Sequence, residues 1–451
     1  MSGVSSTREI ILGVLLEINR DGEYSHIAIR NALDKYQYLP KQDRAFITRV
    51  CEGTVEYMLQ MDYIIGRFSS VKVEKMKPVI REILRSSVYQ LIYMDRIPDS
   101  AVCNEAVKLT QKKGFYSLKG FVNGVLRSIA RNKEHLVFPP KSQPVSYLSV
   151  VYSLPVWLVE KWLSVYDFET VETMAKDFLE DKPTTIRCVQ HMVDMDVTLQ
   201  RLREQDVTVA KAPYLDYAWY ISSYNYLRML TVFRMGCIMV QDVSSMLVAE
   251  AASPREGDYV LDLCAAPGGK SLHVADKMKG TGYVQARDLT EYKVQMIEEN
   301  IRRMNVTNVE ALCRDATVFD RESVGKADIV LADVPCSGLG VIGKKTDIKY
   351  KITPRKQEDL VILQKRILHN AAQYVKPGGT LIYSTCTIAE EENQNNVKWF
   401  VENYPYETDS LDPFLPKELH CDTTAQGYLQ LLPGVHKTDG FFIARLKRTK
   451  E

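Results

Sequence analysis

Two cysteines stand where an α/β sheet could bring two thiols into one pocket. Cys336 ends the apolar run ADIVLADVPC, and Cys386 ends the run GTLIYSTC. The carboxyl ends of parallel strands meet at one edge of a sheet, so both thiols are expected at one crevice. Such a pair suits covalent catalysis, which divides one difficult step into two easier ones. The reaction that this arrangement predicts is methylation of carbon 5 of a cytosine.

The chemistry at cytosine explains why two thiols would be useful. A thiolate added at carbon 6 turns the ring into an enamine, whose carbon 5 can attack a sulfonium methyl group. A second group beside the first can then assist release of the thiolate. The spacing does not say which cysteine attacks.

Two charged residues belong to the same predicted pocket. Asp333 precedes Cys336 by three residues. A carboxylate raises the pKa of a nearby thiol, so Asp333 would not activate it. We assign Asp333 to the cytosine edge, where it would accept from the exocyclic amine and, when protonated, donate to N3. Lys270 could supply positive charge near the thiols or simply hold its own loop.

A glycine-bearing turn, LDLCAAPGGK (261–270), joins a predicted strand to a helix and suits a nucleotide-like cofactor. It is not a Walker loop, because Cys264 stands where that motif needs glycine, and no GxGxxG fingerprint occurs. Acids end the strands that follow: Asp288 suits a ribose diol, and Asp315 suits an adenine amino group. This set predicts S-adenosylmethionine.

Regular strand–helix alternation from about residue 236 to the end would position these residues. It predicts a parallel sheet with helices on both faces, as in Rossmann-like folds. The predicted strands are 259–264, 282–288, 309–315, 327–333, 379–385 and a closing strand at 441–448.

The front of the chain follows a different pattern. Residues 5–131 repeat apolar side chains at three- and four-residue spacing, which predicts an all-helical domain. Asp43 and Ser100 are predicted as helix N-caps. A proline-bearing linker at 135–144 follows.

Between these regions, helical and strand-like stretches mix, which predicts a small α+β domain. Its predicted strands are 184–190 and 207–213, with a helix at 198–205 between them. The chain is therefore expected to contain three domains, at 1–140, 145–235 and 236–451.

Composition fits a soluble enzyme that handles a polyanion. Residues 1–150 carry 22 Lys and Arg against 15 Asp and Glu, whereas the remainder carries 36 against 42. A basic front end indicates a partner such as RNA. Nine cysteines without a CxxC pair argue against a disulfide framework or zinc ribbon, and no run is long enough to span a membrane. We expect no metal, no membrane and a cytoplasmic location.

The motifs at 327–340 and 379–388 resemble the RsmB/NOP family of RNA cytosine-5 methyltransferases. That resemblance implies that Cys386 is the nucleophile and that Cys336 aids product release. It also implies cofactor contacts at Cys264, Ala265, Ala266, Pro267, Gly268, Gly269, Lys270, Asp288, Asp315 and Asp333. DNA cytosine-5 methyltransferases use the Pro-Cys cysteine and lack the Thr-Cys motif, so they match less well.

The front carries a second resemblance. LPKQDRAFITRVCEGTVEY and GFVNGVLRSIAR are similar to the NusB-type RNA-binding domain. This fusion is typical of the bacterial 16S ribosomal RNA enzymes of RsmB (Sun/Fmu) type. It implies 16S rRNA as partner, naked or in a partly assembled small subunit. The sequence carries no signal for oligomeric state, so a monomer is the default expectation.

One stretch departs from the family pattern. GKKTDIKY (343–350) stands where the family shows an arginine-rich sequence with a proline. Lysines keep the charge there but lose the bidentate geometry of arginine. Lys349, Tyr350 and Arg355 are candidates for an RNA channel, with an exposed loop as the alternative.

Two other functions remain open from sequence alone. The first is a tRNA or other RNA cytosine-5 methyltransferase on the same fold, which the NusB-type front disfavours. The second is a non-catalytic RNA-binding assembly factor. The intact set of Cys336, Cys386, Asp333 and Lys270 opposes this second alternative.

Overall fold

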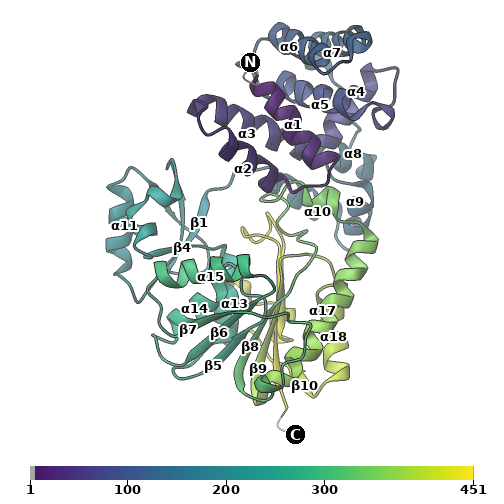
Figure 1. Cartoon of the computed structure of the whole chain (residues 1–451). Helices are drawn as coiled ribbons and strands as arrows, with labels where there is room; N and C mark the ends of the chain where they lie inside the picture. The colour runs from purple at the N-terminus through teal and green to yellow at the C-terminus, as the bar shows by residue number, and fades with distance from the viewer. Residues whose placement is uncertain (1–5, 450–451) are drawn as a thin grey trace. The chain divides into compact units, whose positions relative to one another are not determined.

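The computed structural model describes residues 6–449 and divides into two compact units (Figure 1). The helical unit comprises Met1–Glu180 and Ile342–Lys351, and the sheet unit comprises Asp181–Val341 and Ile352–Glu451. The division falls inside the segment 145–235, which was expected to form one domain, so the three-domain scheme stays a prediction.

The helical unit buries the apolar stripes of its helices against one another, as the spacing predicts. Its core is formed by α1 to α7 and includes the fully buried Leu15, Val50, Leu84 and Leu126. The α-helices are α1 (Thr7–Asn19), α2 (Ser25–Lys35), α3 (Lys41–Glu56), α4 (Met58–Phe68), α5 (Pro78–Tyr93), α6 (Asp99–Lys112), α7 (Lys119–Asn132), α8 (Pro144–Val151), α9 (Val156–Leu163), α10 (Phe168–Asp177) and α16 (Ile348–Lys351). Three short 3₁₀ turns, η1 (Val73–Lys75), η2 (Tyr116–Leu118) and η3 (Lys133–His135), join them.

The two predicted N-caps are wrong by two or three residues. Pro40 and Pro98 occupy the N-cap positions of α3 and α6. A proline is tolerated there because the first helical N–H groups have no intrahelical acceptor. Asp43 and Ser100 therefore lie inside the first turns, where the carboxylate of Asp43 still faces the positive end of the helix dipole.

A ten-residue segment from the second half of the chain, Ile342–Lys351, belongs to the helical unit. Asp347 Oδ2 and Oδ1 accept from Ser25 N and Oγ at 3.0 and 2.7 Å, at the start of α2. Lys349 Nζ donates to Glu56 O at 2.9 Å, at the end of α3. Each charge thus meets the helix end of opposite partial charge, which stabilises the segment in place.

These contacts correct the expectation for Lys349 and Tyr350. Lys349 is 1% exposed, and Tyr350 packs against the core of the helical unit. Both alternatives, an RNA channel and an exposed loop, are therefore wrong for these two residues. Arg355 is exposed, as either alternative requires.

We expect Lys349 to make the helical unit more stable as pH rises above 7. Burial lowers the pKa of Lys349 to about 7 from its ordinary 10.5, although Glu56 opposes the shift. Between these values the unfolded chain binds a proton that the folded chain does not, so the free energy of unfolding rises with pH. Relative to that of Lys349→Met, the free energy of unfolding of wild type should rise by up to ~1.4 kcal/mol per pH unit. Urea unfolding of both proteins at pH 7, 8 and 9 measures this difference.

The control is Lys345→Met, since Lys345 is exposed on the same segment. Its stability should follow that of wild type at every pH. If the free energy of unfolding changes with pH in the same way for wild type and Lys349→Met, the buried lysine is not the source of the pH dependence.

The sheet unit begins with a small antiparallel sheet in the order β2-β3-β1-β4. Two of its strands, β3 and β4, were not predicted. Its elements are β1 (Thr184–Cys188), α11 (Met195–Arg203), β2 (Thr208–Lys211), β3 (Ala218–Ser222), η4 (Leu227–Met229), α12 (Thr231–Arg234) and β4 (Ile238–Val240).

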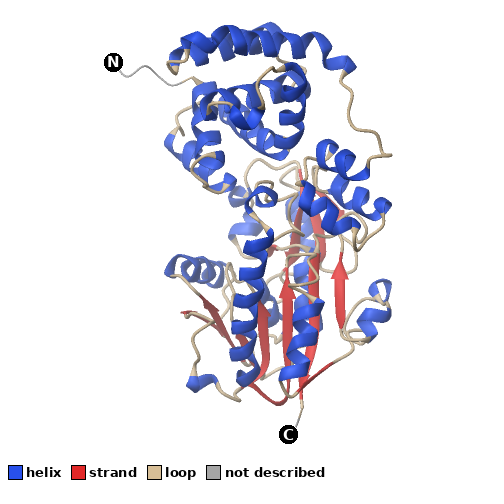
Figure 2. Ribbon diagram, turned by 90° about the vertical axis from the view of Figure 1, so that its right-hand side faces the viewer, coloured by secondary structure: helices blue, strands red, loops and turns tan. Residues whose placement is uncertain are grey.

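The larger sheet has the order β10-β12-β9-β8-β5-β6-β7, with β11 paired to β12. Helices α17 and α18 cover one face, while α13, α14 and α15 cover the other (Figure 1). Figure 2 shows the long strands running beside these helices. The strands are β5 (Tyr259–Asp262), β6 (Tyr283–Asp288), β7 (Val309–Cys313), β8 (Ala327–Asp333), β9 (Val375–Thr385), β10 (Tyr406–Thr408), β11 (Tyr428–Leu431) and β12 (Phe441–Arg448). The helices are α13 (Val243–Ala252), α14 (Gly269–Lys277), α15 (Glu291–Arg303), α17 (Pro354–Tyr374), α18 (Gln394–Asn403) and α19 (Asp422–Ala425), with 3₁₀ turns η5 (Arg321–Ser323) and η6 (Lys417–Leu419).

This sheet confirms the predicted α/β layers but corrects the all-parallel arrangement. Strands β5 to β9 are parallel to one another, whereas β12 runs antiparallel to β9. Apolar patterning reports that a strand is buried and does not report its direction. Among the residues that the structure describes, no helix is long and apolar enough to cross a membrane.

Candidate active site

The two predicted cysteines meet at the carboxyl edge of the larger sheet. Cys386 follows β9 directly, and Cys336 lies three residues beyond β8. Asp333 pairs with Ser384 across the parallel ladder, which sets the two strand ends level. As a result, Cys336 Sγ and Cys386 Sγ are 3.3 Å apart, close enough to share a hydrogen bond.

Two glycines allow the backbone to close around this pair. Gly340 N donates to Cys386 O at 3.0 Å, and Gly440 N donates to Gly340 O at 2.9 Å. A Cβ at Gly340 would lie 1.9 Å from Gly440 O, so no other residue fits at position 340 without moving the backbone.

Asp333 and Lys270 form an ion pair beside the cysteines. Lys270 Nζ lies 2.7 Å from Asp333 Oδ2, and Ser384 Oγ donates to Asp333 Oδ1 at 2.8 Å. Burial would lower the pKa of Lys270, but the charges of Asp333 and Cys386 help to raise it. A protonated Lys270 in turn favours the thiolate of Cys386, which supports the positive charge that was expected there.

The surroundings of Cys336 favour the protonated thiol instead of the thiolate. Its hydrogen bond with Cys386 is the largest cause that raises the pKa of Cys336, followed by burial and by the charges of Cys386 and Glu392. The pair therefore consists of one thiol that keeps its proton and one that lies near a lysine ammonium. This asymmetry distinguishes two cysteines that the sequence spacing alone did not.

The glycine-bearing turn between β5 and α14 has the shape of a cofactor loop. Gly268 adopts φ 97°, a conformation that side chains rarely accept, and a Cβ there would lie 3.3 Å from Ile297. Ala265 N donates to Arg287 O at 2.8 Å, which fixes the turn against the end of β6. These contacts fix the turn that leads into α14, where the first N–H groups of the helix can donate to a ligand.

The predicted acids lie along the same edge. Asp288 is buried, and its Oδ2 accepts from Ala266 N at 2.9 Å, which joins it to the cofactor loop. Arg314 N donates to Asp288 O at 2.9 Å, so the exposed Asp315 lies one residue beyond a direct contact with β6. The loop, Asp288, Asp315 and Asp333 thus line up along the sheet edge that carries the cysteines.

Sequence reasoning missed two buried carboxyl groups near this edge. Asp262, the last residue of β5, is fully buried, and burial raises its pKa to about 7 while Ser271 Oγ donates to it at 2.6 Å. Glu392, also fully buried, contacts the Cys336 loop. An acid that ends a strand was a usable signal for Asp262. Nothing in the pattern around Glu392 marked it as buried.

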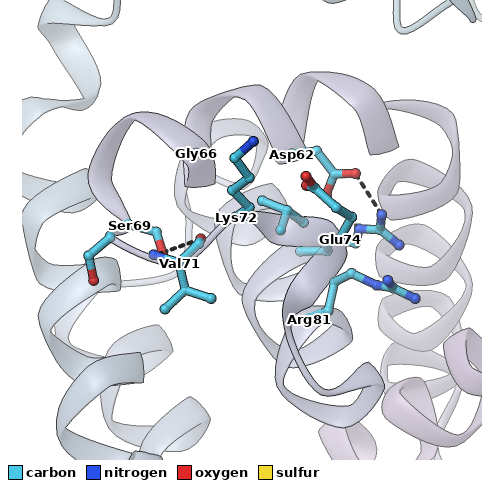
Figure 3. A pocket seen from close by; sticks show the side chains of 10 residues that line it. Asp62, Gly66, Ser69, Val71, Lys72, Glu74 and Arg81 are labelled. Atoms are coloured by element: carbon cyan, nitrogen blue, oxygen red, sulfur yellow. Dashed lines mark hydrogen bonds and ion pairs between the residues drawn. The ribbon is translucent and has the colours of Figure 1, made fainter.

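A separate pocket of about 340 Å³ lies in the helical unit (Figure 3). One of its two arginines is already neutralised, because Arg85 Nη2 lies 2.6 Å from Asp62 Oδ2 and Arg85 Nη1 lies 2.8 Å from Glu82 Oε1. None of the predicted site residues lines it. The lining residues are Asp62, Gly66, Ser69, Ser70, Val71, Lys72, Val73, Glu74, Arg81 and Arg85.

Two regions of this chain match the models of known protein families. A family model for the 16S rRNA methyltransferase RsmB/F matches residues 249–447, and a NusB family model matches residues 5–131. The probable ribosomal RNA small subunit methyltransferase B of Bacillus subtilis (strain 168) is 36% identical over 98% of this chain and 99% of its own. The chain belongs to the RsmB family. Ribosomal RNA small subunit methyltransferase B of Cronobacter sakazakii is 29% identical over 90% of each chain.

The fold agrees with this RsmB assignment. The crystal structure of PH0851 superposes with a TM-score of 0.81 and 25% identity, covering 98% of both chains. The predicted NusB-like front and methyltransferase sheet are confirmed. Membership of the RsmB family also implies S-adenosylmethionine as the methyl donor.

Proposed function

We propose that this RsmB-family chain transfers a methyl group to carbon 5 of a cytosine in 16S rRNA through a covalent adduct on Cys386. The observation that carries the proposal is the 3.3 Å separation of Cys386 Sγ and Cys336 Sγ beside Lys270 and Asp333. Methylation at an exocyclic nitrogen or a ribose hydroxyl would need no thiol, whereas carbon 5 needs a nucleophile at carbon 6.

The loop and the acids fit S-adenosylmethionine. The backbone around Gly268 can approach a ligand closely, and Asp288 stands where an acid would hold a ribose diol. Cys264 through Lys270, with Asp288, Asp315 and Asp333, would hold the cofactor. When bound, the cofactor supplies an electrophilic methyl group.

We expect Asp288→Asn to weaken cofactor binding by about tenfold, because a charge-assisted hydrogen bond to the ribose is lost. Isothermal titration with S-adenosylhomocysteine measures the dissociation constant without any RNA. Glu298→Gln, which lies on α15, is the control and should bind like wild type. Unchanged affinity in Asp288→Asn would remove Asp288 from the cofactor site.

Cys386 begins the proposed reaction. Its thiolate, favoured by Lys270, adds to carbon 6 of cytosine, and the electron pair of the 5,6 double bond moves to carbon 5. Asp333 would accept from the exocyclic amine and hold the ring at the cysteines. Carbon 5 then takes the methyl group, which leaves a saturated adduct bound through sulfur.

Cys336 would assist the release of that adduct. A base removes the proton on carbon 5, the 5,6 double bond forms again, and the electrons of the carbon–sulfur bond return to Cys386 Sγ. Cys336 keeps its proton because its pKa is raised, and its sulfur lies 3.3 Å from the departing one. It can therefore protonate the leaving sulfur and later regain a proton from water.

RNA suits this site as substrate for a physical reason. Carbon 6 of a stacked base is covered, so the target cytosine must be unpaired or extruded. The NusB-like front would position the RNA through its phosphates. The relatives are named for small-subunit ribosomal RNA, and we propose 16S rRNA, naked or partly assembled, as the substrate of this chain as well.

Nucleoside mass spectrometry tests the proposal. Unmodified, protein-free 16S rRNA and, separately, 30S particles would be incubated with enzyme and S-adenosylmethionine, beside tRNA. New 5-methylcytidine in 16S rRNA or the particles alone is the expected result. Product in tRNA would favour the alternative substrate. No product in any sample would favour a non-catalytic assembly factor.

A further inference from the structure

Two consecutive residues beneath the cysteines, Glu392 and Asn393, have no role in the proposed chemistry. Both are 0% exposed, although each carries a polar group that is costly to bury. They follow Cys386 in the chain by six and seven residues and precede α18. Buried polar groups persist when they are fully hydrogen-bonded, so their partners show what they hold.

Glu392 holds the loop on both sides of Cys336. Ser337 N donates to Glu392 Oε2 at 2.9 Å. Gln364 Nε2 donates to the same oxygen at 2.8 Å and to Pro335 O at 3.0 Å. The residues immediately before and after Cys336 are thus tied to one carboxylate, which a third donor, Gln357 Nε2, completes at 3.0 Å.

Asn393 holds the residues on both sides of Cys386 in the same manner. Thr385 Oγ1 donates to Asn393 Oδ1 at 2.5 Å, and Asn393 Nδ2 donates to Thr387 O at 3.0 Å. A further contact joins the two loops, since Ser337 Oγ and Thr387 Oγ1 are 2.7 Å apart. The separation of the two sulfurs therefore depends on this buried network.

We propose that Glu392 and Asn393 are a pair of positioning residues, of which Glu392 serves Cys336 in adduct release and Asn393 serves Cys386 in attack. This inference rests on the proposed function, because attack and adduct release are steps of that reaction. Their adjacency in the chain fixes the two loops relative to each other, because a shift of one residue moves the other.

The chemical difference between the two residues matches the difference between the two thiols. The hydrogen bond with Cys386 and burial raise the pKa of Cys336 most, and the charge of Glu392 adds to them in the same direction. Asn393 is neutral and leaves the thiolate of Cys386 unopposed. Two more ionisable residues, Cys386 and Tyr383, interact with Cys336. Burial raises the pKa of Tyr383.

Single-turnover kinetics separate the two roles. Glu392→Gln should leave methyl transfer nearly unchanged but slow release by about tenfold, so that a covalent protein–RNA complex accumulates. Asn393→Ala should slow the formation of the adduct by a similar factor, without accumulation. Glu402→Gln, exposed on α18, is the matched control. A general loss of stability would slow both steps together in both variants, and that outcome would overturn the inference.

Alkylation of the full-length protein by iodoacetamide, followed peptide by peptide, tests the same inference without RNA. Glu392→Gln should speed the alkylation of Cys336, and Asn393→Ala should change the alkylation of Cys386 alone. If wild type forms no 5-methylcytidine but this split is seen, only the proposed function fails. If Glu392→Gln does not fold, Gln364→Met removes the tie to Pro335 O and should change the alkylation of Cys336 but not that of Cys386. Equal changes at both cysteines in either variant would refute the assignment.

Discussion

Cys386→Ala is expected to lose 5-methylcytidine formation by roughly 10⁴-fold or more, as other enzymes do when their nucleophile is removed. Without the thiol at the end of β9, the neighbouring thiol is that of Cys336, whose raised pKa disfavours the thiolate that must add to carbon 6 of cytosine. Lys270 would remain paired with Asp333, so the fold and the cofactor loop should be preserved. Quantitative nucleoside mass spectrometry on 16S rRNA measures the loss, and titration with S-adenosylhomocysteine verifies that the cofactor still binds.

Cys421→Ser is the control for thiol reactivity as such. Burial would raise the pKa of Cys421, but hydrogen bonds from Thr423 and its neighbours outweigh it and lower that pKa. Cys421 is exposed and lies at the start of α19. Its replacement should leave activity unchanged, because reactivity without a partner thiol and a cytosine pocket has no catalytic consequence. Normal turnover in Cys386→Ala would remove Cys386 as the nucleophile.

The edge that carries the candidate site was predictable because strand ends are local features of the sequence. Asp288, Asp333 and Cys386 each follow a short apolar run, and a parallel sheet brings such ends together whatever the intervening residues are. The spacing in the sequence could not distinguish the two cysteines. That distinction depends on Lys270 and Glu392, whose distances from the thiols exist only in the folded chain.

The errors have a shared physical origin. Lys349, in the short helix α16, and Glu392, in a turn, are charged residues, and such residues are normally exposed. Each is buried here because a specific backbone or amide partner compensates it, Glu56 O for Lys349 and Ser337 N for Glu392. The antiparallel direction of β12 was missed for a related reason, since local periodicity carries no information about long-range pairing.

Cys336→Ala is expected to form the adduct and then stall, so that the protein remains covalently attached to RNA. Cys386 and Lys270 are untouched in this variant, so addition and methyl transfer proceed. The group that would protonate the departing sulfur at 3.3 Å is lost, and release should slow by about 100-fold, within the range of general acid catalysis. Denaturing gel electrophoresis with labelled 16S rRNA detects the complex as a slowly migrating band.

The double variant Cys336→Ala/Cys386→Ala decides which sulfur carries the bond in that complex. If Cys386 is the nucleophile, the double variant forms no covalent complex, although each single change acts on a different step. If the complex persists, some other residue attacks carbon 6. If Cys336→Ala turns over normally with no trapped RNA, the thiol at the end of the Pro-Cys loop has no part in release, and the short sulfur–sulfur distance reflects packing alone.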